Sequence, residues 1–144
     1  MKHLTIKLVL PLTVILFALL TKWWCVKVDD APNTILQGFP LPFTGPAWGS
    51  SMSFQYFLLE FLIDFGVYFL FVFTITYLIH RFLIHKKPHN MICICLFIVA
   101  GLCVCLQGLM IYSCDSFFYL HREFSINVIN VGYIFLGEKP PNCY

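Results

Sequence analysis

Charged residues are scarce in this chain. Asp, Glu, Lys and Arg make up 11% of its 144 residues, whereas they make up roughly 25% of a typical soluble domain. Hydrophobic residues make up 60%, which argues against disorder, because disordered segments are poor in hydrophobic side chains. The net charge is only +2, and no basic stripe interleaved with aromatic residues is present, so we expect no nucleic-acid partner. The composition indicates a membrane protein.

Sequence motifs of catalysis are also absent. The chain has no nucleophile elbow, phosphate-binding loop or zinc-protease helix, and it has no Cys-x-x-Cys redox pair. It also has no repeat of fixed period and no low-complexity tract, so we expect a single domain over residues 1–144. We expect this domain not to be an enzyme and to hold no cofactor or metal ion.

Long apolar runs are what the chain has instead. They predict an all-α integral membrane protein with three membrane-spanning helices, at about residues 8–24, 53–80 and 91–113. Between the first two spans we expect an extracytoplasmic loop rich in Pro and Gly, and after the third a short extracytoplasmic tail, residues 114–144. A cleaved signal peptide is the alternative for the first run, but no small-residue cleavage site follows it.

The basic residues predict the orientation in the membrane. The N-terminus and the segment 80–90 carry more Lys and Arg than the other side, which favours a cytoplasmic N-terminus and an outer C-terminus in a bacterial inner membrane. Segment 80–90 also holds His80, His85 and His89. We interpret it as a cationic loop near anionic lipid headgroups, with metal binding as the alternative.

An acidic stripe lies within the second expected span. Tyr56, Glu60, Asp64 and Tyr68 recur every four residues, which places them along one face of a helix. A charged side chain in hydrocarbon costs several kcal/mol on insertion scales, so it needs a partner, a proton or a wet cavity. Three hypotheses follow: an ionic socket for a partner's cation, a proton or cation site, or an internal contact. The internal contact would use Arg122, His121, Lys22 or a backbone group.

The seven cysteines fall into two groups. Cys93-x-Cys95 and Cys103-x-Cys105 lie on an expected helix, where residues two apart point about 200° apart, so neither pair can chelate a metal from one face. We expect them to pack as small apolar residues. A second group should lie on the outer side, where one disulfide with open pairing is expected: Cys25, Cys114 and Cys143.

Small residues form a seam on the third expected span, at Gly101, Cys105 and Gly108. Such a seam lets another helix approach closely, either from the same chain or from another subunit. Together these features predict an accessory or structural subunit of a larger membrane complex, whose partners are the lipid bilayer and other membrane protein subunits. The alternatives are a proton- or ion-coupled component that uses Glu60 and Asp64, and a membrane thiol oxidoreductase that uses the outer cysteines.

Overall fold

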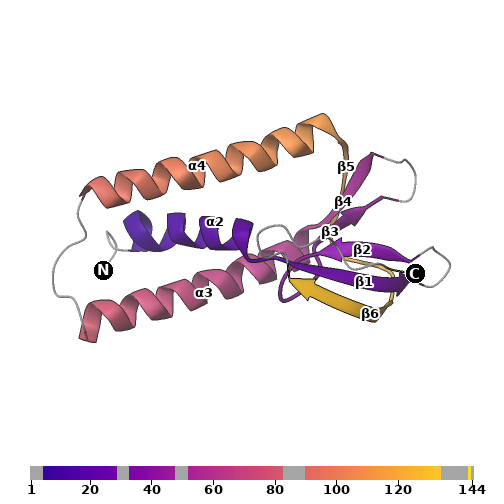
Figure 1. The fold of residues 1–144 in the computed structure, drawn as a ribbon, viewed down its shortest axis with the longest axis horizontal. Helices are drawn as coiled ribbons and strands as arrows, with labels where there is room; N and C mark the ends of the chain where they lie inside the picture. Colours follow the sequence, from indigo (N-terminus) through magenta and orange to yellow (C-terminus); the bar gives the residue numbers. More distant parts are fainter. Residues whose placement is uncertain (1–4, 29–32, 48–51, 83–89, 134–142, 144) are drawn as a thin grey trace. The chain divides into compact units, whose positions relative to one another are not determined.

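A mixed β-sheet is the main departure from these expectations. The computed structural model describes residues 5–28, 33–47, 52–82, 90–133 and 143, and it contains six paired strands as well as helices (Figure 1). The prediction of an all-α membrane protein with three spanning helices is therefore wrong. Within the described ranges, two helices are long and apolar enough to cross a bilayer, Leu58–Phe82 and Asn90–Ser113, and by themselves they do not establish an integral membrane protein.

The chain begins with two helical segments, continues with four strands and two long helices, and ends with two strands. In chain order they are η1 (Thr5–Val9), α2 (Leu10–Leu19), β1 (Lys22–Val28), β2 (Thr34–Gln37), β3 (Thr44–Pro46), β4 (Ser53–Phe57), α3 (Leu58–Phe82), α4 (Asn90–Ser113), β5 (Asp115–Tyr119) and β6 (Ile126–Tyr133). The chain divides into two compact units. One comprises Met1–Ala18 and Phe65–Gly108, and the other comprises Leu19–Asp64 and Leu109–Tyr144. All the strands belong to the second, which we call the sheet unit.

The sheet has the strand order β5-β4-β3-β2-β1-β6. All neighbours pair antiparallel except β4 and β5, which run parallel with Ser53 opposite Asp115 and Phe57 opposite Tyr119. β4 continues directly into α3, and β5 begins directly after α4. The parallel pair therefore connects the two long helices to the sheet.

The first expected span, residues 8–24, is replaced by a short helix and a strand. The helix α2 ends at Leu19, and β1 begins at Lys22. Trp23 and Trp24, at the end of that expected span, pair with Gln37 and Leu36 of β2. Aromatic and β-branched residues favour strands, and here the long-range pairing decides the outcome. The expected second span loses its beginning in the same way, because Ser53–Phe57 is β4.

The core of the sheet unit lies on the neighbouring strands β1 and β2. Val26, Val28 and Leu36 are almost fully buried, and Trp24, Phe124 and Ile126 pack against them. Burying a side chain of this kind stabilises a fold by about 1.5–3 kcal/mol. The segment between β5 and β6, which contains Phe124, thus covers the face on which β1 and β2 place their apolar residues.

The other unit is helical. Val9, Pro11 and Thr13 are buried there, and so are Tyr68, Val72 and Thr76, which lie four residues apart on one face of α3. The ring of Phe17 contacts those of Phe65 and Tyr68 edge-on, with centroids 5.8 and 5.5 Å apart. On α4 only Cys93 and Ala100 are buried. The cationic loop expected between the long helices lies mostly outside the described residues, which stop at Phe82 and resume at Asn90.

Candidate functional site

Asp64 is the most deeply buried charged residue described, with an exposed fraction of 0%. It lies in the second turn of α3, and its carboxylate accepts two backbone hydrogen bonds from the segment between β2 and β3. The Phe39 N–H donates to Oδ2 and the Leu41 N–H donates to Oδ1, each at 2.9 Å. Both oxygens of this acid are therefore occupied by donors of its own chain.

The segment that Asp64 holds is the loop Gly38–Phe43, with the sequence Gly-Phe-Pro-Leu-Pro-Phe. Its Phe39–Pro40 peptide bond is cis, and Gly38 has a φ of 152°. A Cβ atom on Gly38 would overlap the Leu41 carbonyl oxygen, so this position requires glycine. The Gly38 carbonyl accepts a hydrogen bond from the Trp24 indole at 2.7 Å, which ties the loop to β1.

Glu60 makes a matching contact one turn earlier on α3. Its Oε1 accepts a hydrogen bond from the Arg122 N–H at 3.1 Å, and the Leu59 N–H donates to the Leu120 carbonyl at 2.9 Å. The first turn of a helix has N–H groups without partners inside the helix, and an acid there is also favoured by the helix dipole. The segment 120–122 therefore caps the start of α3.

The side chain of Arg122 does not pair with Glu60. Its Nε donates to the Phe124 carbonyl at 3.2 Å, and its guanidinium lies 5.8 Å from the centroid of the Phe124 ring. Among the residues that the structure describes, Glu60 Oε2 and Arg122 Nη1 are buried without a hydrogen-bond partner. Of the contacts expected for Glu60, the structure thus shows the one to a backbone group.

The remaining members of the expected acidic stripe lie elsewhere. Tyr56 belongs to β4, where its ring stacks on that of Phe118 with centroids 5.5 Å apart. Burial raises the pKa of the Tyr56 hydroxyl. Tyr68 is buried in the helical unit, beside Phe17. The structure thus brings Glu60 and Asp64 to two loops of the sheet unit and does not group all four side chains around one site.

The three cysteines that were expected on the outer side divide into a disulfide-bonded pair and a single thiol. Cys25 in β1 forms a disulfide with Cys143, across 118 residues of sequence, and the Asn33 side-chain amide donates to the Cys143 carbonyl at 3.0 Å. Cys114 carries a free thiol. No group of three or more His, Cys, Asp or Glu residues is placed to hold a metal ion within the part of the chain that is described.

The glycine seam on α4 faces open space. A Cβ atom added at Gly101 or Gly108 would meet nothing within 4 Å, and Cys105 is exposed. The described residues of this chain therefore do not fill the seam.

Both acids have a structural role: each carboxylate accepts backbone hydrogen bonds from a loop that is distant in the sequence, and so holds that loop against the start of α3. The partner-socket, ion-coupling and thiol-enzyme hypotheses remain predictions. The loop Gly38–Phe43 was not expected as the partner of Asp64. The signal for it was the alternation of Pro40 and Pro42 with residues that keep an N–H.

Comparison with known proteins adds no identification. No model of a known family matches the chain, and no significant similarity to a curated protein or to a solved structure was found.

Proposed function

We propose that the protein is an accessory subunit of a membrane complex, attached to the bilayer by α3 and α4, with its sheet unit on the outer side. The main support for this proposal is the exposed apolar surface of the two helices. Only 17% of the apolar window of α3 and 11% of that of α4 are buried within the structure. A core helix of a soluble protein would be mostly buried, and a large exposed apolar surface marks an interaction site or a membrane site.

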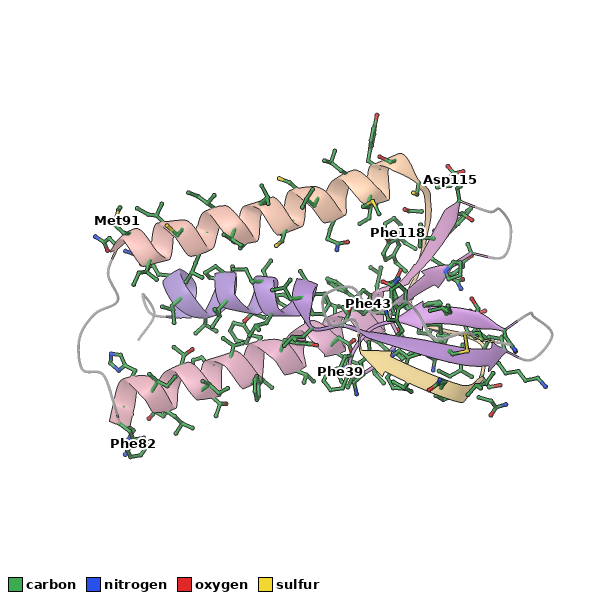
Figure 2. All side chains as sticks on the ribbon, in the orientation of Figure 1. Phe39, Phe43, Phe82, Met91, Asp115 and Phe118 are labelled. Atoms are coloured by element: carbon green, nitrogen blue, oxygen red, sulfur yellow. A yellow bond between two sulfur atoms is a disulfide. The ribbon has the colours of Figure 1, made fainter. Side chains whose placement is uncertain are left out.

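The length and polar chemistry of these helices support lipid as the surroundings. At about 1.5 Å per residue, α3 and α4 are each about 36 Å long, which exceeds the hydrocarbon thickness of about 30 Å. The exposed Thr74 hydroxyl donates to the Leu70 carbonyl at 2.8 Å, so this polar group is satisfied within its own helix, as lipid surroundings require. Figure 2 shows side chains projecting outward along both helices.

The disulfide supports the outer location of the sheet unit. Disulfides persist in oxidising compartments and are rare in the cytosol of most organisms, and Cys25–Cys143 lies in this unit. The orientation agrees with the basic residues predicted on the cytoplasmic side.

The open seam on α4 supports the role of a subunit. Gly101 and Gly108 leave room for another helix to approach closely, and the described part of this chain leaves that room unfilled. We propose that a helix of a partner subunit packs there. The acids Glu60 and Asp64 are engaged internally, so this proposal does not need them as a socket.

The test uses the full chain, purified from native membranes in nanodiscs, with its particle mass and the stoichiometry of all co-purifying chains measured. We expect a defined hetero-complex for the natural chain. Gly101→Leu and Gly108→Leu should dissociate it by blocking the partner helix, because no described residue of the chain itself opposes a larger side chain at these positions. Val99→Phe is the matched control, since Val99 is exposed on the opposite face of α4.

Each other result would contradict part of the proposal. A lone monomer or homo-oligomer would overturn the subunit role. Release of the protein from membranes by an alkaline carbonate wash would overturn the attachment itself.

A further inference from the structure

The loop Gly38–Phe43 is an irregular segment whose backbone donors are all used. Gly38 N–H donates to the Lys22 carbonyl at 3.1 Å, and Phe43 N–H donates to the Gln37 carbonyl at 2.9 Å. Phe39 and Leu41 N–H donate to Asp64. The two remaining residues are prolines, which have no N–H. The loop therefore offers no backbone donor to a surrounding medium, and an unsatisfied donor is one of the backbone groups that cost free energy beside lipid.

The side chains of the loop are apolar and partly turned outward. Phe39 and Leu41 have exposed fractions of 37% and 36%, while Phe43 packs edge-on against Phe61 of α3, with ring centroids 5.5 Å apart. Figure 2 shows Phe39 and Phe43 beside the first turns of α3. The loop is thus an apolar, partly exposed segment whose backbone is hydrogen-bonded to Asp64.

The position of the loop along α3 is fixed by the same hydrogen bonds. Asp64 lies two turns into the helix, and its neighbours Leu62 and Ile63 are exposed. Phe39 and Leu41 therefore lie beside helical turns that themselves present apolar side chains outward. The ammonium group of Lys22 lies 4.2 Å from the centroid of the Phe39 ring. A cation next to an apolar projection complements an anionic lipid headgroup above acyl chains.

We propose that the loop Gly38–Phe43 inserts into the outer leaflet of the membrane, with Phe39 and Leu41 at the boundary between headgroups and acyl chains. Asp64 is the positioning residue of this loop. The inference rests on the proposed function, because it requires α3 to enter the bilayer beside the loop. Lipid fits this surface better than a protein strand does, because strand pairing needs a backbone donor and the loop has none left to share.

The experiment uses the full chain in nanodiscs of phosphatidylcholine and phosphatidylglycerol. The photoreactive residue p-benzoylphenylalanine replaces Leu41, and lipid adducts are detected by mass spectrometry after irradiation. The same residue replaces Leu70 of α3 as a positive control and Ile129 of β6 as a negative control, both of which are exposed. We expect lipid adducts at positions 41 and 70 and none at position 129.

The other outcomes separate this inference from the proposed function. An adduct at position 70 without one at position 41 would overturn the inserted loop and leave the attachment through α3 standing. A protein adduct at position 41 would overturn it in favour of a protein partner. No lipid adduct at either position would overturn both proposals.

A second variant tests the role of the loop geometry. Gly38→Ala disturbs the loop without changing α3, because an added Cβ overlaps the Leu41 carbonyl oxygen. We expect the adduct yield at position 41 to fall several-fold while the yield at position 70 is unchanged. An unchanged adduct yield at position 41 would show that contact of residue 41 with lipid does not depend on the loop conformation.

Discussion

At the residue scale, Glu60 and Asp64 differ in the number of hydrogen bonds that their carboxylates accept. Asp64 accepts two backbone hydrogen bonds, one on each oxygen, whereas Glu60 accepts one on Oε1 and leaves Oε2 without a partner among the described residues. Hydrogen bonds to charged groups contribute about 1.5–3 kcal/mol, and an unpaired buried donor is costly. Replacing each acid by its amide should therefore have unequal effects.

Asp64→Asn should loosen the loop Gly38–Phe43. The amide nitrogen of Asn cannot accept a hydrogen bond, so either the Phe39 or the Leu41 N–H loses its partner. The free energy of opening the loop should fall by about 1–3 kcal/mol. Hydrogen exchange of the loop amides, measured by mass spectrometry on the full chain in nanodiscs, should accelerate about 5- to 150-fold.

Glu60→Gln is the matched control, because it also removes one negative charge but keeps the Oε1 acceptor for the Arg122 N–H. We expect a smaller change in exchange near residues 120–122 than Asp64→Asn causes in its loop. Equal acceleration at both sites would show that the charge of these acids, and not the number of hydrogen bonds, stabilises the loops.

At the scale of the element, α3 changes character along its length. Its first turns belong to the sheet unit and bind two loops, while Phe65–Phe82 belongs to the helical unit. In that second part, one face carries the buried residues Tyr68, Val72 and Thr76, and the other presents large apolar side chains outward. One continuous helix thus contributes residues to both units. The effect of a substitution in α3 should therefore depend on the unit to which the residue belongs.

Leu70→Arg tests the outward face of α3. Leu70 is 64% exposed, and an Arg in the middle of a helix in the bilayer costs about 2.5–3.5 kcal/mol on insertion scales. The fraction of protein that remains in the membrane pellet after an alkaline carbonate wash should fall. Ile129→Arg, on the exposed face of β6, should leave that fraction unchanged. If both variants behave like the natural chain, lipid does not contact this face.

At the scale of the whole molecule, the sheet unit is held together by contacts between distant parts of the sequence. Strand β1 pairs with β2 on one side and with β6 on the other, and the disulfide joins β1 to Cys143 near the C-terminus. A cross-link over a long stretch of chain stabilises a fold by restricting its unfolded state, by about 2–5 kcal/mol for a native disulfide. The stability of this unit should therefore depend on oxidation.

Cys25→Ser should lower the midpoint of thermal unfolding, followed by tryptophan fluorescence of the purified chain. Trp23 and Trp24 adjoin this cysteine in β1 and report on the sheet unit. Cys95→Ser is the control, because Cys95 is a free, exposed thiol on α4. The unfolding midpoint of this variant should match that of the natural chain.

Alkylation tests the disulfide directly. In the natural chain, alkylation after unfolding should modify five cysteines, and prior reduction should raise this number to seven. Seven without reduction would contradict the disulfide.

Part of the fold and of the candidate site could be predicted from local properties of the sequence. The run of apolar residues predicted a helix at 91–113, close to the observed Asn90–Ser113. Hydropathy and helical period depend on neighbours within a few turns, so they can be read directly from a sequence. The spacing of Glu60 and Asp64 likewise placed both acids along one side of a helix.

Only the tertiary structure decided that Lys22–Val28 is an interior strand of the sheet and that Ser53–Phe57 is a strand before α3. Both segments are apolar enough to extend a helix, and their pairing with distant strands settles their conformation. The partners of the acids were equally hidden, since Asp64 binds residues more than twenty positions away and Glu60 binds one 62 positions away. Such contacts depend on which loops the sheet brings to the start of α3, and no local pattern encodes that arrangement.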